Sequence, residues 1–301
     1  MNEQTQEPEP SVEITTRRIF LSDGTEAATQ TIGPAPGHDN LGDIVICHGT
    51  PWSSRMWLPH ARELGRSHRV LLWDMPGYGE SIAEAALPVD LVTQGRRLAE
   101  LMTVWDAQFP QVIAHDIGGA VALGAHLFGG SEFASLYLLD IVTLPPWGSP
   151  FFRLVADNES VFTSLPPQLH RALVTEYIAG AGGARLERSW AEILAEPWCT
   201  VAGQAAFYHQ IASLRPEHTE PIVEGLGEVR CPVRIGWGAE DPWIPFGQAE
   251  QLAQRLPGTA DITSFRAAGH LVPVESPQEL SDDLAAWLGS VPLSPTQISA
   301  T

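Results

Sequence analysis

Short apolar runs alternate with longer helical stretches through most of the chain, and this alternation is the feature that most constrains its fold. Runs of this kind that end at a turn are typical of buried strands. Strands that alternate with helices predict a mainly parallel central sheet flanked by helices on both faces, an α/β fold. The predicted strands lie at 17–22, 26–32, 43–49, 69–77, 111–116, 135–142, 232–238 and 260–265, and the main predicted helices at 61–67, 90–105, 117–128, 247–257 and 277–288.

The alternation stops between about Thr143 and Gly225, where the chain shows helical segments broken by prolines, at 165–181, 186–197 and 203–214. We interpret this stretch as an inserted helical cap over the carboxyl ends of the strands, where open α/β sheets bind ligands. The sequence therefore predicts an α/β core of residues 13–144 and 226–292 and a cap of residues 145–225. The polar ends, residues 1–12 and 293–301, are predicted to be flexible tails.

The charge balance excludes several classes of partner. The chain has 36 acidic and 17 basic residues and a net charge of −19. Such a surface repels phosphate backbones and anionic lipids, so we expect neither nucleic acid nor membrane binding. The chain also lacks a long apolar run and a secretory signal pattern, which leaves a soluble cytoplasmic protein as the default expectation. A homodimer is compatible with the sequence.

The cysteines and histidines give no sign of a metal centre. Cys47, Cys199 and Cys231 form no CxxC motif, and two of them lie in or beside apolar runs, as small buried hydrophobic residues do. The ten histidines are scattered without the spacing of metal ligands. We therefore predict no metal site.

The segment VIAHDIGGA, residues 112–120, runs from a predicted strand directly into a predicted helix. This is the pattern of a nucleophile elbow, in which small residues let a strained turn hold one side chain at the edge of the sheet. The usual pattern has serine at its centre, and here the residue is Asp116. The alternative interpretation is that Asp116 only caps the following helix.

Two further segments lie where a hydrolase site would need them. The loop Cys47-His48-Gly49-Thr50-Pro51 follows a strand, and the N–H groups of Thr50 and Ile117 are predicted to form an oxyanion hole. The segments GWGAED and AAGH carry Asp241 and His270. The chain order Asp116, Asp241, His270 is nucleophile, acid, base.

With these segments the chain resembles the α/β-hydrolase superfamily, in the branch of epoxide hydrolases and haloalkane dehalogenases that use an aspartate nucleophile. The motifs HGTP, DMPGYGES, HDIGG, GAED and AGH carry the resemblance, which covers about residues 15–290. It implies a two-step reaction without a cofactor. The carboxylate of Asp116 attacks an sp³ carbon to give an alkyl ester, and water activated by His270 then hydrolyses that ester.

Two carboxylates could orient His270. Asp241 lies 29 residues before His270, as in epoxide hydrolases, whereas Asp140 lies 24 residues after Asp116, where some dehalogenases of the superfamily place their acid. Asp140 could equally be a hydrogen-bonded residue at the end of a strand. We favour Asp241.

The choice between an epoxide and a halide depends on the hydrogen-bond donors of the pocket. The resemblance implies cap tyrosines for epoxide opening, and we favour Tyr208 over Tyr177, which we expect to pack in a helix. Related dehalogenases place tryptophan or arginine after the nucleophile, where this chain has Ile117. An indole N–H on a halide could still come from Trp52, Trp147 or Trp198.

We therefore expect an epoxide hydrolase that acts on a small, largely apolar epoxide. Aromatic residues of the cap favour an apolar pocket: Trp147, Phe151, Phe152, Phe162 and Phe207. A haloalkane or haloacid dehalogenase is the first alternative. A non-catalytic ligand-binding protein and a cofactor-free lyase or cyclase on the same scaffold are alternatives of another class.

Overall fold

The computed structural model describes residues 12–34, 39–83 and 87–291. Its centre is one sheet of eight strands in the order β1-β2-β4-β3-β5-β6-β7-β8. The strands β3 to β8 are mutually parallel, and β1 and β2 are antiparallel at one edge. The bounds are β1 Glu13–Phe20, β2 Glu26–Gly33, β3 Asp43–Cys47, β4 Arg69–Trp73, β5 Gln111–His115, β6 Ser135–Leu139, β7 Val233–Gly238 and β8 Asp261–Phe265.

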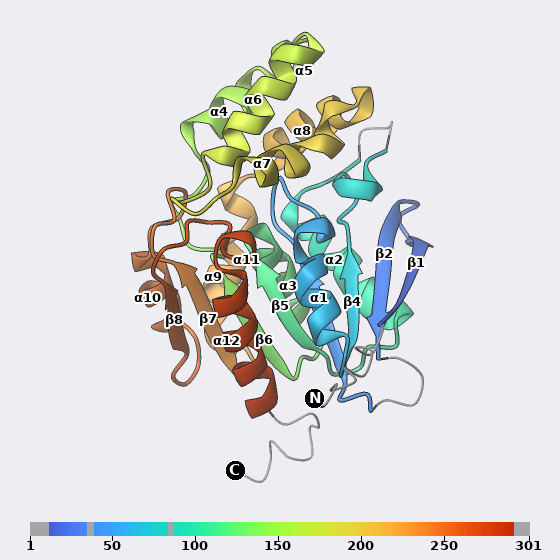
Figure 1. Ribbon diagram of the computed structural model, residues 1–301, viewed down its shortest axis with the longest axis vertical. Helices are drawn as coiled ribbons and strands as arrows, with labels where there is room; N and C mark the ends of the chain where they lie inside the picture. The colour runs from blue at the N-terminus through green and yellow to red at the C-terminus, as the bar shows by residue number, and fades with distance from the viewer. Residues whose placement is uncertain (1–11, 35–38, 84–86, 292–301) are drawn as a thin grey trace, which may run out of the picture.

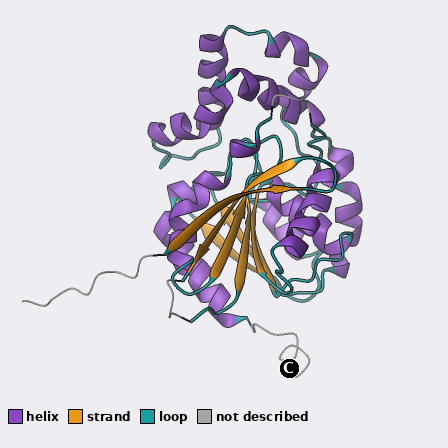
Figure 2. Cartoon of the chain, turned by 90° about the vertical axis from the view of Figure 1, so that its right-hand side faces the viewer, coloured by secondary structure: helices purple, strands orange, loops and turns teal. Residues whose placement is uncertain are grey.

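Helices cover both faces of the sheet (Figures 1 and 2). All residues of β5 and β6 are buried, which is why these strands appear in the sequence as continuous apolar runs. The core helices are α1 Leu58–Leu64, α2 Leu91–Val104, α3 Ile117–Leu127, α10 Gly247–Ala253, α11 Val272–Glu275 and α12 Pro277–Ser290. Short 3₁₀ helices lie at η1 Ser54–Trp57, η2 Gly79–Ser81, η3 Glu196–Cys199, η4 Pro216–His218 and η5 Leu226–Glu228. No helix within the described ranges is long and apolar enough to cross a membrane.

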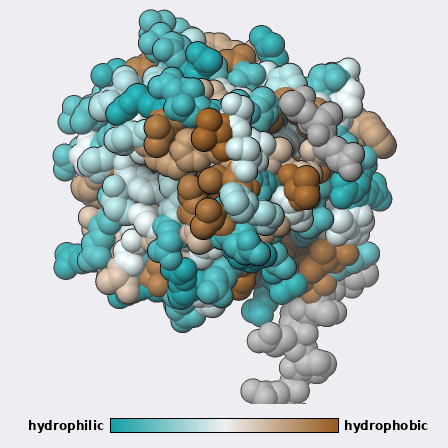
Figure 3. Space-filling model, turned by 90° about the horizontal axis from the view of Figure 1, so that it is seen from above, coloured by the Kyte–Doolittle hydropathy of each residue, from teal (hydrophilic) through white to brown (hydrophobic). Residues whose placement is uncertain are grey.

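The chain between β6 and β7 contains helices and loops but no strand, and its first helices form a layer above the carboxyl ends of the sheet (Figure 1). These cap helices are α4 Pro150–Asp157, α5 Glu159–Thr163, α6 Pro167–Ala179, α7 Arg188–Ala195 and α8 Val201–Ser213. Sequence analysis did not single out α4 and α5. Seen from above, apolar patches interrupt the hydrophilic surface (Figure 3), and the strongly exposed apolar residues of the cap are Leu154, Val161, Leu169 and Val201.

The last helix within the predicted cap contacts a helix of the core. Helix α9, Glu220–Gly225, packs against α3, where Gly225 faces Leu127 and Phe128 and Ile222 is buried. The cap boundary at residue 225 stays a prediction, because contact of one helix with the core does not by itself place the end of the cap. The predicted tails, 1–12 and 293–301, lie outside the described residues except for Val12.

Candidate active site

Asp116 occupies the turn between β5 and α3 with φ 54° and ψ −128°, in a region that residues other than glycine rarely adopt. The neighbouring glycines make the turn possible. A Cβ at Gly118 would lie 2.5 Å from the backbone oxygens of Cys47 and His48, and one at Gly119 would lie 2.4 Å from the Ile141 side chain. The Asp116 carboxylate does not cap α3. The capping interpretation is therefore wrong, and the strained turn directs the carboxylate elsewhere.

The carboxylate of Asp116 faces the turn after β3. The backbone N–H of Thr50 donates a hydrogen bond to Asp116 Oδ2 at 2.8 Å. Ile117 is the first residue of α3, so its N–H has no acceptor within the helix. Gly49 has to be glycine here, because a Cβ would lie 2.4 Å from Cβ of Asp116. The Thr50 N–H thus lies where a negative oxygen of Asp116 would be stabilised, and the Ile117 N–H is left available as the second predicted donor.

His270 lies between two carboxylates, and the three side chains are almost completely buried. Its Nδ1 is 2.7 Å from Asp241 Oδ2, and its Nε2 is 3.7 Å from Asp116 Oδ2. The first distance is a strong hydrogen bond and the second is too long for a direct one. Nε2 has no hydrogen-bond partner in the described structure. His270 is therefore oriented by Asp241 and keeps one nitrogen free towards Asp116.

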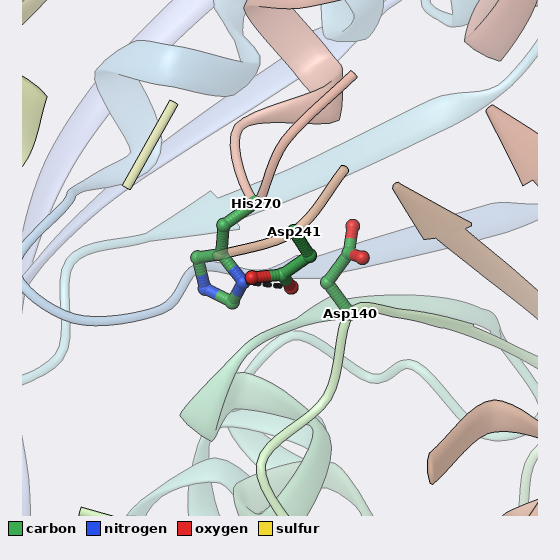
Figure 4. A group of neighbouring side chains, drawn as sticks. All are labelled: Asp140, Asp241 and His270. Atoms are coloured by element: carbon green, nitrogen blue, oxygen red, sulfur yellow. Dashed lines mark hydrogen bonds and ion pairs between the residues drawn. The ribbon is translucent and has the colours of Figure 1, made fainter. Parts of the chain in front are cut away.

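The structure distinguishes the two candidate acids (Figure 4). Asp241 Oδ1 accepts hydrogen bonds from the backbone N–H groups of Trp243 and Ile244 at 2.7 and 2.9 Å, which holds the carboxylate with its Oδ2 2.7 Å from Nδ1 of His270. Asp140 instead accepts from the Gly238 N–H at 2.7 Å. Burial and the charge of Asp241 raise the pKa of Asp140 well above its usual value. Asp241 is thus the carboxylate hydrogen-bonded to His270, and Asp140 is a buried neighbour whose carboxyl faces the Gly238 N–H.

Asp140, Asp241 and His270 are also the group of described residues whose side-chain atoms converge closely enough to hold a metal ion, within 4.8 Å of one another. The Asp241–His270 hydrogen bond uses two of the three atoms that such an ion would need. We assign no metal to this group.

Burial lowers the pKa of His270, but the charges of Asp241 and Asp116 outweigh this effect and raise it well above the usual value. We therefore expect Asp116→Asn to lower the pKa of His270, because it removes one of the two charges that hold the proton. An NMR titration of the His270 ring measures this change. Asp140→Asn is the matched control and should change the pKa of His270 less, since the Asp140 carboxyl is hydrogen-bonded to the Gly238 N–H and not to the imidazole. A His270 pKa that does not move in Asp116→Asn would contradict this account.

A cavity of about 360 Å³ opens beside Asp116. Thr50, Asp116 and Ile117 form part of its wall, and the aromatic side chains of Trp147, Phe152, Tyr177 and Trp243 form much of the rest. Among the described residues, Asp116 is the only Asp, Glu, Lys or Arg side chain in the lining. The arrangement can hold a small neutral molecule with one carbon near the carboxylate.

Tyr208, the predicted proton donor, does not line this cavity. It is fully buried in the cap, and its O–H donates to Nδ1 of His170 at 2.9 Å, while Nε2 of His170 donates to the Trp198 carbonyl. Tyr177 does line the cavity, and no hydrogen bond from its hydroxyl group is found in the described structure. Burial and the charge of Asp116 raise the pKa of Tyr177 well above its usual value. The available phenol is therefore Tyr177, because the hydrogen bond within the cap turns Tyr208 away.

Several other predicted residues have structural partners. Nδ1 of His48 donates to the Gly49 carbonyl at 2.8 Å and Nε2 accepts from the Met75 N–H at 2.9 Å, so this imidazole supports the turn and does not face substrate.

The indole N–H of Trp147 donates to Thr219 at 2.9 Å, although its ring lines the cavity. The indole of Trp198 donates to the Pro51 carbonyl at 2.8 Å. Of the other predicted pocket aromatics, Phe152 lines the cavity, and Phe151, Phe162 and Phe207 do not. Trp52, a candidate indole donor to a halide, does not line the cavity either.

Sequence analysis missed Trp243. Its ring lies 5.3 Å from His270 and 4.8 Å from Tyr177, measured between ring centroids, so it packs between the base and the candidate proton donor. Its position two residues after Asp241, in the motif GAEDPW, was the signal available in the sequence.

Comparisons with known proteins agree with this geometry at the level of the family. Residues 44–283 match the alpha/beta hydrolase family. A crystal structure of an alpha/beta hydrolase fold protein from Burkholderia ambifaria is 37% identical, with a TM-score of 0.83 over 90% of this chain and 97% of that one. A candidate carbamate hydrolase, RutD, of Caulobacter sp. (strain K31) is 25% identical over 82% of this chain and 89% of its own length. A pimeloyl-acyl-carrier protein methyl ester esterase of Chromobacterium violaceum is 26% identical, over 86% and 96%.

Proposed function

The chain belongs to the α/β hydrolase family, and we propose that it hydrolyses its substrate through a covalent ester on Asp116. One observation carries this proposal. The strained elbow presents a carboxylate, not a hydroxyl group, to the N–H of Thr50 and to His270. A carboxylate is well suited to displacement at an sp³ carbon, whereas acyl transfer generally uses a hydroxyl or thiol nucleophile with a histidine base.

The favoured substrate is a small, neutral, apolar epoxide. In the first step an oxygen of Asp116 attacks a ring carbon, the carbon–oxygen bond of the ring breaks, and the Tyr177 O–H gives its proton to the leaving oxygen. The availability of this hydroxyl in the cavity supports the assignment. An anionic substrate would meet the charge of Asp116 and no Lys or Arg in the lining.

In the second step water attacks the ester carbonyl carbon while Nε2 of His270 takes its proton. The negative oxygen that forms lies against the N–H groups of Thr50 and Ile117. Collapse of this intermediate releases the diol oxygen, which takes the proton back from His270, and the proton left on Asp116 returns to Tyr177 through solvent. Esterification also removes the charge of Asp116, so it lowers the pKa of His270 and favours the base form that this step needs.

Two other substrates compete with the epoxide. The names of two relatives favour an ester or carbamate. A halide is favoured by Trp243, which lines the cavity and whose indole N–H makes no hydrogen bond that the described structure shows. A panel of epoxides, alkyl halides, esters and carbamates, scored separately for diol, halide and acid, tests the proposal. Release of acid alone, with no diol or halide, would contradict it.

Tyr177→Phe should slow the alkylation of Asp116 by epoxides, because it removes the donor to the leaving oxygen. General acids of this kind contribute roughly 10²–10⁴-fold to the rate. Rapid-quench measurement of ester formation gives the rate of this step. Tyr208→Phe is the matched control, since its hydroxyl is bonded within the cap, and its alkylation rate should stay close to that of the wild type. A larger loss of alkylation rate in Tyr208→Phe than in Tyr177→Phe would identify Tyr208 as the proton donor instead.

A further inference from the structure

The turn that contains Thr50, whose N–H is the oxyanion donor, forms hydrogen bonds with residues of the cap. Gln210, on α8, is almost fully buried, and its Oε1 accepts a hydrogen bond from the Thr50 hydroxyl at 2.7 Å. The same oxygen accepts from the Tyr78 hydroxyl at 3.1 Å. The indole of Trp198 donates to the carbonyl of the next residue, Pro51. Two consecutive residues of the oxyanion turn are therefore hydrogen-bonded to the cap.

This contact is more than packing. The Nε2 of Gln210 is buried without a hydrogen-bond partner among the described residues. An unpaired buried donor is costly, so an apolar side chain of similar size would serve better if Gln210 only filled space. What stabilises Gln210 at this position is the pair of hydrogen bonds that its Oε1 accepts. One of them comes from Thr50, the residue whose backbone N–H contacts Asp116.

We propose that Gln210 is a positioning residue of the oxyanion hole and acts through Thr50. By accepting a hydrogen bond from the Thr50 hydroxyl, Gln210 fixes the turn, so that the Thr50 N–H stays directed at Oδ2 of Asp116. This inference rests on the proposed ester mechanism. The N–H is needed most in the second step, because negative charge then concentrates on an oxygen of Asp116. During alkylation the negative charge leaves Asp116, so the same N–H gives that step no help.

Gln210→Leu should therefore slow hydrolysis of the ester and leave its formation nearly unchanged. Loss of a whole oxyanion donor costs roughly 10²–10³-fold, and we expect about tenfold when the donor stays but loses its support. The enzyme should then accumulate as the ester during turnover. Quenched-flow mass spectrometry of the peptide that contains Asp116, with styrene oxide as a representative apolar epoxide probe or another epoxide that the panel shows to be turned over, measures both steps.

Gln204→Leu is the matched control. Gln204 also lies on α8, but its Nε2 donates only to carbonyls of the cap, those of Thr163 and Leu165. This variant should lower stability without changing the ratio of the two rates. If Gln210→Leu does not fold, Thr50→Val removes the same hydrogen bond from the other side and keeps the Thr50 N–H.

The double variant Gln210→Leu/Thr50→Val gives the decisive comparison. If Gln210 acts through the Thr50 hydroxyl, the double variant should be about as slow in hydrolysis as the slower of the two single variants. Additive losses, or an equal loss in both steps, would overturn the positioning role while the ester mechanism stands. If neither the wild type nor His270→Ala forms an ester on Asp116 with any substrate of the panel, the mechanism itself fails, and the role of Gln210 fails with it.

Discussion

His270→Ala should stop the enzyme after its first half-reaction, with the substrate bound covalently to Asp116. Alkylation needs only the carboxylate and the proton donor, whereas hydrolysis of the ester needs a base beside the attacking water. The free Nε2 of His270, 3.7 Å from Asp116 Oδ2, is the only imidazole nitrogen that the described structure places in that position. Steady-state turnover should fall by at least roughly 10²–10⁴-fold, the contribution of a general base.

The mass of the trapped peptide identifies the chemistry. An epoxide adds its whole mass to the peptide that contains Asp116, because the opened ring keeps its oxygen. An alkyl halide adds its mass minus that of hydrogen halide. Asp241→Asn provides a useful comparison, because it keeps the imidazole but removes the charge that orients it. Its ester should therefore be hydrolysed slowly, whereas the ester of His270→Ala should persist. A His270→Ala variant that turns over normally would show that another group activates water.

The sequence predicts those parts of the site whose structure is determined within a short segment of the chain. Gly49, Gly118 and Gly119 are required because a Cβ at each would collide with Asp116 or with its neighbouring elements, and this need is visible as HGTP and HDIGG. The buried parallel strands are visible for a similar reason, since full burial leaves a continuous apolar run. Fold class and the placement of Asp116, Thr50 and His270 follow from such short segments.

The parts that the sequence did not resolve depend on contacts between distant segments. Tyr177 and Tyr208 both lie in helices of the cap, and what distinguishes them is His170, which accepts a hydrogen bond from the Tyr208 hydroxyl. Asp140 and Asp241 follow neighbouring strands, and their roles separate only through the backbone N–H groups that each carboxyl faces. Gln210 gave no signal, because its partner Thr50 is 160 residues away in the chain.

Asp116→Ala should abolish turnover and covalent labelling together, down to the rate of the reaction in buffer. Removal of the carboxylate leaves the oxyanion donors and His270 in place, so any remaining hydrolysis would have to come from water activated by His270 alone. Product analysis of the variant with the best substrate of the panel, beside mass spectrometry of the intact protein, measures both effects. Turnover that survives without Asp116 would remove it as the nucleophile and favour the acyl-hydrolase or lyase alternatives.

A single turnover of the wild type in H₂¹⁸O separates these mechanisms without any mutation. If water attacks the carbonyl carbon of the Asp116 ester, the new oxygen remains on Asp116, and the first product carries only oxygen from the unlabelled enzyme and substrate. The peptide that contains Asp116 should then gain the mass of one ¹⁸O-for-¹⁶O exchange. If His270 instead directs water onto the substrate, the label enters the product at once and the peptide stays unlabelled. The geometry favours the first result, because the Thr50 N–H is already directed at an Asp116 oxygen, where the negative charge of the ester hydrolysis would develop.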